Sequence, residues 1–183
     1  MQTEEQRVLE HLVNENIHFI RQGRSLIVDM EPEYFSSLKD AGGRGTISAH
    51  IRHCIDMYTC FFMGLPEILI DYDHRERDHE VERNKFKAEQ KLTEHVYRLL
   101  ELRENPPENL EVHIRRVINN GDGVSTEHRI PSSILRELHI LSSHTVHHYA
   151  LIANILALHD LEYPEHFGVA PSTIAYWKKE NKW

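Results

Sequence analysis

Two histidines four residues apart, His144 and His148, form the part of the sequence best suited to chemistry. The surrounding pattern predicts a helix over 132–159, and side chains four residues apart on a helix lie one above the other. Leu141 and Leu151 share that face, so both imidazoles are expected to face the core. A buried imidazole must be neutral and either hydrogen-bonded or bound to a metal ion. The pair therefore indicates two hydrogen-bonded core histidines or two ligands of one metal ion.

A helix predicted over 46–63 can supply a third ligand. It carries His50 and His53, which lie three residues apart and so near the same face, and either can meet the first pair across a helix bundle. Three neutral imidazoles with a coordination position left for water or substrate are typical of a catalytic metal site, whereas four protein ligands are typical of a structural one. Imidazole suits zinc, nickel, copper and iron(II), and we expect zinc or nickel before iron.

Several other side chains are candidates for orienting a ligand or lining a pocket. Asp56 lies one turn after His53 and can hydrogen-bond a ligand histidine, although an aspartate on the helix surface fits the pattern equally well. His147 lies about 100° around its helix from His148 and is expected to be a neighbour of the ligands. A charge-rich segment after the second helix can line a pocket mouth or form a salt-bridged loop, and its candidates are Asp71, Asp73 and Arg75.

Other kinds of active site find little support. Thr145, Val146 and His147 separate the paired histidines, so the glutamate that acts as general base in zincins is missing. The sequence contains neither a glycine-rich phosphate loop nor a Gly-x-Ser-x-Gly motif. Cys54 and Cys60 lie in an apolar helix, where inert buried thiols are expected rather than nucleophiles or a disulfide.

The composition is that of an ordinary globular protein. Of the 183 residues, 40% are hydrophobic and 27% are charged, and we expect one domain over 1–183. A formal charge of −8 disfavours nucleic acid as a partner. The first residues lack the features of a signal peptide and no apolar run is long enough to cross a membrane, so no membrane association and a cytoplasmic location are expected.

Histidine is overrepresented, with 15 copies, and such an excess can indicate metal binding. Many of these residues nevertheless lie among charged or loop residues and are expected to be exposed to solvent: His79, His95, His113, His128, His159 and His166.

Hydrophobic periodicity predicts most of the secondary structure. Gly23 is expected to end the first helix, and Ser132 to cap the fourth. Two alternating segments around the turn Asn119–Gly123 predict a β-hairpin. Four long helices joined by short links predict an all-α fold, a four-helix bundle with a small β-hairpin insertion before the fourth helix and a C-terminal helix. The helices are expected over 3–22, 46–63, 80–104, 132–159 and 171–183, a connector over 25–30, and the strands over 110–118 and 124–130.

Two segments resemble the DinB-like (DinB/YfiT-like) family. In Thr46–Asp56, a histidine followed three residues later by an acid is similar to the family's pattern on its second helix. In Ser143–Tyr149, the His-x-x-x-His spacing is similar to the family's last bundle helix. Ile70–Arg77 and Phe167–Ser172 are similar to a subgroup, so the resemblance spans most of the chain.

The resemblance implies a four-helix bundle, a divalent metal ion bound by three histidines and often a homodimer. Matched residue by residue, it places the ligands on His53, His144 and His148, because the acid three residues after His53 is Asp56. It leaves His50 and His147 as neighbours of those ligands. Some members of the family are thiol-dependent transferases and some are hydrolases.

Two main hypotheses about function follow. In the first, the chain is a metal-dependent hydrolase or thiol-dependent transferase, in which the ion activates water or a small thiol toward an unidentified small molecule. In the second, it is a non-catalytic metal-binding or stress-related protein in which the ion stabilises the bundle. A third is a scaffold dimer without metal. An enzyme requires an open coordination position, and a structural site requires a fourth protein ligand.

Overall fold

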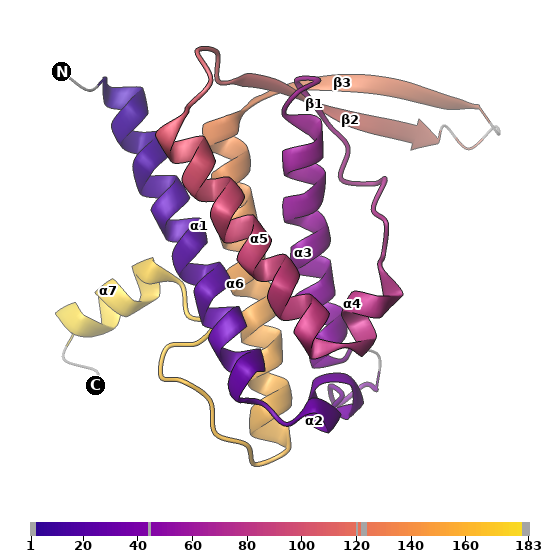
Figure 1. Cartoon of the computed structure of the whole chain (residues 1–183), viewed down its shortest axis with the longest axis vertical. Coiled ribbons are helices and arrows are strands. Elements are labelled where there is room, and N and C mark those ends of the chain that lie inside the picture. The colour runs from indigo at the N-terminus through magenta and orange to yellow at the C-terminus, as the bar shows by residue number, and fades with distance from the viewer. Residues whose placement is uncertain (1–2, 44, 120, 122–123, 181–183) are drawn as a thin grey trace.

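The computed structural model describes residues 3–43, 45–119, 121 and 124–180. Within these residues the chain forms seven helices and three strands, and the strands lie between helices in the sequence (Figure 1). The helices are α1 Glu4–Asp29, α2 Pro32–Ser37, α3 Ile47–Gly64, α4 His79–Arg83, α5 Lys85–Glu104, α6 Ile134–Leu158 and α7 Pro171–Lys179, and the strands are β1 Leu69–Ile70, β2 Glu111–Asn119 and β3 Ser125–Ser133.

The four long helices α1, α3, α5 and α6 pack side by side, and the sheet lies across one end of them (Figure 1). Each contributes fully buried residues to one hydrophobic core, such as Ile20, Ile51, Leu99 and Leu138. The helix α2 lies at the other end of the long helices, and α7 projects from their side (Figure 1). This packing holds one face of α3 against α6, the two helices that carry the histidines singled out above.

The all-α fold class predicted from the sequence is wrong. The helices are accompanied by a three-stranded mixed sheet in the order β1-β2-β3, in which β1 is parallel and β3 antiparallel to β2. With seven helices in the described residues, the chain is also not a four-helix bundle extended by one hairpin and one helix. The strand β1 escapes detection because two residues cannot show an alternating pattern. It forms because Leu69 and Ile70 lie opposite His113 and Ile114 in the folded chain.

Gly23 does not end the first helix, and the predicted connector over 25–30 is helical up to Asp29. Leu26 and Ile27 extend the buried stripe of α1 by another turn. A Cβ at Gly23 would collide with the buried hydroxyl group of Tyr149 on α6. The glycine therefore permits close contact between α1 and α6.

Two further predicted helix boundaries are wrong. The helix predicted over 80–104 divides at Asn84, whose side chain caps α5 by accepting hydrogen bonds from two backbone N–H groups. The fourth helix begins at Ile134 with Ser133 as its cap, because β3 extends to Ser133. Pro131 fits this strand because β3 is an edge strand. Parts of the predicted turn Asn119–Gly123 and of the C-terminal helix, namely 120, 122–123 and 181–183, lie outside the described residues.

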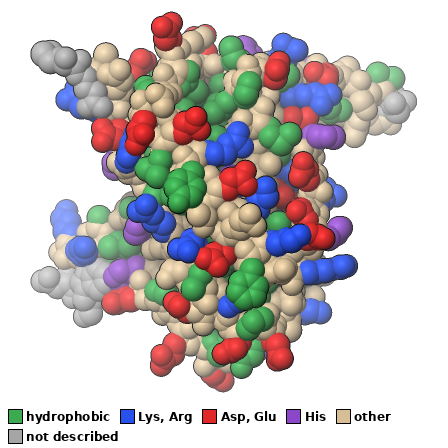
Figure 2. Space-filling view, viewed as in Figure 1, with side chains coloured by type: hydrophobic (Ala, Val, Ile, Leu, Met, Phe, Trp, Pro, Cys, Tyr) green, Lys and Arg blue, Asp and Glu red, His purple; other side chains and the backbone are tan. Residues whose placement is uncertain are grey.

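Charged side chains of both signs are intermixed over the face shown in Figure 2. Among the charged side chains of the protein, Arg24 pairs with Glu89 and Lys91 pairs with Glu94. This face therefore lacks the segregated basic patch typical of proteins that bind nucleic-acid phosphates. None of the described helices combines the length and the apolar character needed to cross a membrane.

His95 is buried, with 1% of its surface exposed, so the prediction of an exposed residue is wrong. It lies on the inner face of α5, where its ring stacks on Phe62 and its Nε2 is 3.2 Å from the hydroxyl oxygen of Thr59. Burial lowers the pKa of His95 to about 4. The imidazole is therefore neutral in the folded protein at pH 7.

We expect the folded state to lose stability as the pH falls from 7 to 4. Between those values the unfolded chain protonates His95 while the folded chain does not, which favours unfolding by on the order of 3 kcal/mol at pH 4. Urea unfolding at both pH values, compared between wild type and His95→Gln, measures this contribution. The variant should lose less stability on acidification, whereas His128→Gln, which alters an exposed histidine, should lose as much as wild type. Equal losses in wild type and His95→Gln would contradict the assignment.

Candidate metal centre

His53 on α3 and the pair His144 and His148 on α6 lie together, each offering a ligand atom within 4.8 Å of the others. Nε2 of His144 is 2.8 Å from Nε2 of His53 and 3.2 Å from Nε2 of His148. Two nitrogen ligands of a tetrahedral zinc ion lie about 3.3 Å apart, given bonds of about 2.0 Å. The separations of His144 from His53 and from His148 are therefore within about half an ångström of the spacing expected around one ion.

These histidines lie at the edge of the core, and each is half-buried. The neighbours of His53 on α3, Ile51 and Cys54, are buried and hold that helix against the core. On α6, Thr145 and Tyr149 alternate with the paired histidines and are buried too. The face that carries the histidines is thus the margin of each buried stripe, which leaves the cluster accessible from solvent.

All three imidazoles are neutral at pH 7. Burial, with repulsion from neighbouring histidines and from Arg75, lowers the pKa of His53 to about 4. Burial and four neighbouring histidines lower the pKa of His148 to about 3, and burial also lowers the pKa of His144. Because a metal ion binds the neutral ring, the donor set fits a divalent cation.

His50 does not join the three convergent imidazoles and instead lies behind one of them. Its Nδ1 is 2.9 Å from Nδ1 of His148, the ring nitrogen that does not face His144. A hydrogen bond at that position fixes the tautomer and the orientation of a ligand ring. His147 is exposed, and its ring centre is 5.3 Å from that of His148.

Asp40 was not singled out in the sequence, although it lies near His50. Burial lowers the pKa of His50. The negative charge of Asp40 opposes this shift, because it favours the protonated imidazole. The carboxylate of Asp40 accepts a hydrogen bond from the backbone N–H of Gly45 at 2.9 Å. A Cβ at Gly45 would crowd both side chains. The signal in the sequence is weak, because an aspartate before glycines is also common in ordinary turns.

Asp56 contacts an arginine rather than a histidine. Its carboxylate is 2.6 Å from Nη1 of Arg52, whose Nε donates to Glu82 at 2.8 Å. This network ties α4 to α3 beside the cluster. The sequence left two alternatives for Asp56, a hydrogen bond to a ligand histidine or a position on the helix surface. Neither describes it, because it is a buried partner in an ion pair.

The aspartates of the charge-rich segment bind the hairpin. Asp71 pairs with Arg115 at 2.8 Å, and Asp73 pairs with Arg116 at 2.7 Å. Arg75 alone among the three candidates reaches the cluster, where its Nη1 donates to Nδ1 of His53 at 3.0 Å.

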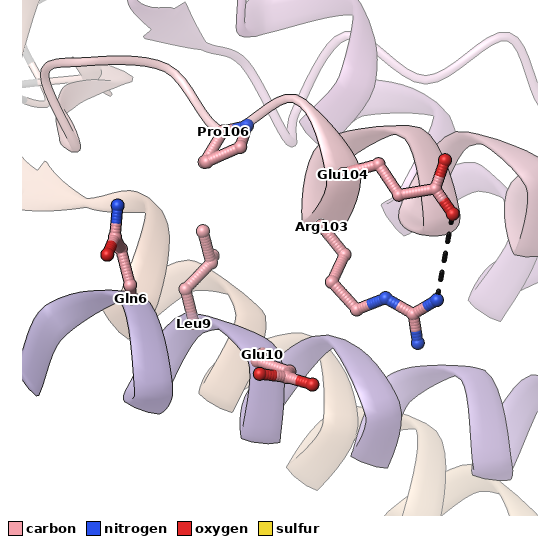
Figure 3. A pocket seen from close by; sticks show the side chains of 6 residues that line it. All are labelled: Gln6, Leu9, Glu10, Arg103, Glu104 and Pro106. Atoms are coloured by element: carbon pink, nitrogen blue, oxygen red, sulfur yellow. Dashed lines mark ion pairs between the residues drawn. The ribbon is translucent and has the colours of Figure 1, made fainter. Parts of the chain in front are cut away.

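Five cavities of the described residues are lined by side chains outside the histidine cluster. One of about 370 Å³ lies between the start of α1 and the end of α5 (Figure 3). In it, a guanidinium nitrogen of Arg103 lies 3.8 Å from a carboxylate oxygen of Glu104. The cluster is thus a partly exposed surface site rather than the floor of one of these cavities. The lining in Figure 3 is Gln6, Leu9, Glu10, Arg103, Glu104 and Pro106.

No family model matches the chain. A curated protein from Rhizopus delemar, FK506-binding protein 5, is 31% identical to it over 112 residues, which are 61% of this chain and 28% of that protein. The similarity thus spans less than a third of this relative's length. It does not bear on the resemblance to the DinB-like family.

Proposed function

We propose that His53, His144 and His148 bind one divalent metal ion, zinc or nickel before iron, in a metal-dependent hydrolase or thiol-dependent transferase. The observation that carries the proposal is the convergence of three neutral imidazoles from two helices. Such an ion lowers the pKa of bound water or thiol and so supplies a nucleophile at neutral pH. The substrate would be a small molecule, since the formal charge of −8 disfavours nucleic acid.

The number of ligands supports a catalytic site. The grouping contains three donors in the described part of the chain, and a closed structural site would use four. His50, the nearest further histidine, has its Nδ1 directed at His148. We therefore assign His50 the role of orienting His148, and we leave the remaining coordination positions to water, thiol or substrate.

The three ligands lie within segments that resemble the DinB-like family, which supports kinship with it. A homodimer and a cytoplasmic location are proposed on the same basis. We do not extend FK506 binding to this chain, because the match covers only 28% of the protein that bears that name.

Two chromogenic assays test the proposed activity. Protein loaded with zinc or nickel should accelerate either the hydrolysis of p-nitrophenyl acetate or the displacement of chloride from chlorodinitrobenzene by the thiol of mercaptoethanol, by about tenfold or more over metal-free protein. The matched control is His144→Ala treated with the same metal, which should remain at the metal-free rate.

Equal rates for loaded wild type and His144→Ala in both assays would contradict an enzyme of either kind. If zinc then still raised the melting temperature of wild type, the non-catalytic alternative in which the ion stabilises the fold would be favoured.

A further inference from the structure

Arg75 brings a positive charge to the outer edge of the histidine cluster. Its Nη1 is 3.0 Å from Nδ1 of His53, while Nε2 of the same ring faces His144. Its Nε is buried and lacks a hydrogen-bond partner among the described residues. A guanidinium has five N–H donors, and Nε–H of Arg75 is one that the described residues leave unpaired.

The carboxylates around Arg75 are already paired with other arginines. Asp56 pairs with Arg52, and the two aspartates of the charge-rich segment pair with arginines of β2. Within the described ranges, no carboxylate lies within ion-pair distance of Arg75. A half-buried guanidinium without a counter-ion is costly, so an anion from outside the chain would relieve this cost.

The segment that carries Arg75 is held at both ends. Before it, Asp71 accepts hydrogen bonds from the backbone N–H groups of Asp73 and His74. After it, Asp78 caps α4 by accepting from the backbone N–H of Glu80. The guanidinium is therefore positioned in advance, which lowers the entropic cost of binding an anion.

The position of the ring proton on His53 also favours an anion beside Arg75. When Nε2 of His53 binds a metal ion, the ring proton lies on Nδ1. Nδ1–H and the N–H groups of Arg75 are then all donors, so the hydrogen bond between them is lost. One oxygen anion between the two side chains can accept from both, and a carboxylate matches the planar guanidinium.

We propose that Arg75, together with Nδ1–H of His53, binds a carboxylate group of the substrate. This inference rests on the proposed function and narrows its substrate class to small molecules that carry a carboxylate near the reacting group. Metal and carboxylate binding are coupled through His53, so each raises the affinity for the other.

Acetate is the probe for this coupling. The zinc affinity of the full chain is measured by competition with a chromogenic chelator, in sodium acetate and in sodium perchlorate of equal ionic strength. Wild type should bind zinc about fivefold more tightly or more in acetate. Arg75→Met should bind zinc equally in both salts, and Arg77→Met, which removes an exposed arginine of the same segment, should behave as wild type.

An acetate effect of wild-type size in Arg75→Met would overturn the inference. Zinc binding by wild type without any acetate effect would also overturn it and would leave the metal site standing. Failure of wild type to bind zinc in either salt would refute the proposed function and this inference together. If Arg75→Met does not fold, Arg75→Lys serves instead, and it should show a smaller acetate effect than wild type because the planar fork is lost.

Discussion

Replacing His148 with alanine is expected to lower the affinity for zinc by about a hundredfold or more. Its Nε2 is one of three imidazole nitrogens in the cluster, so the variant leaves two ligands from the protein. Loss of a residue that merely orients a ligand lowers metal affinity about 10- to 100-fold, and loss of the ligand itself should cost at least as much. Competition with a chromogenic chelator measures the change.

The adjacent residue provides the matched control. His147→Ala removes an exposed imidazole from the same helix and should leave zinc affinity unchanged. His50→Ala should fall between the two, with a loss of about tenfold, because it removes only the hydrogen bond to Nδ1 of His148. A loss in His147→Ala as large as that in His148→Ala would show that the ligands are assigned wrongly.

Gly168→Ala is expected to destabilise the protein by about 4 kcal/mol, from left-handed backbone strain and from overpacking. Gly168 has a φ of +72°. A Cβ there would collide with the backbone of Tyr149 and Ala150, immediately after His148. The preceding residue, Phe167, stacks on Tyr149 with ring centres 4.8 Å apart. The variant should therefore also weaken zinc binding, since it pushes against the ligand helix.

Gly43→Ala separates the two causes. Gly43 has a φ of +67°, but a Cβ there would meet no atom within 4 Å. This variant should lose only the backbone contribution, about 1 kcal/mol. Urea unfolding measures both variants, and an equal loss would refute the role of close contact between Gly168 and α6.

The placement of two histidines on one face of α6 could be anticipated from the sequence, because it depends on local periodicity. Spacing of four residues puts His144 and His148 on one face wherever a helix forms. Spacing alone left His50 and His53 as alternatives, and the resemblance to a known family chose His53. In the structure His53 faces the pair with Nε2, and His50 lies behind His148.

Features that depend on distant contacts could not be anticipated. The strand β1 exists only because β2 lies beside it, so the fold class was mistaken. A glycine such as Gly23 is typical of a helix end, but here it permits close contact between α1 and α6. His95 lies in a charged stretch of the sequence, but its side chain is buried in the core. The hydrogen bond of Arg75 joins a loop to a helix 22 positions earlier, and no local pattern encodes it.

The zinc content of wild-type protein is the most direct test of the metal site. The protein is purified without an affinity tag, reconstituted with zinc and freed of excess metal. Its zinc content is then measured by elemental mass spectrometry. Three convergent imidazoles predict about one zinc ion per chain. A content below about a tenth of an ion per chain would contradict a site of any useful affinity.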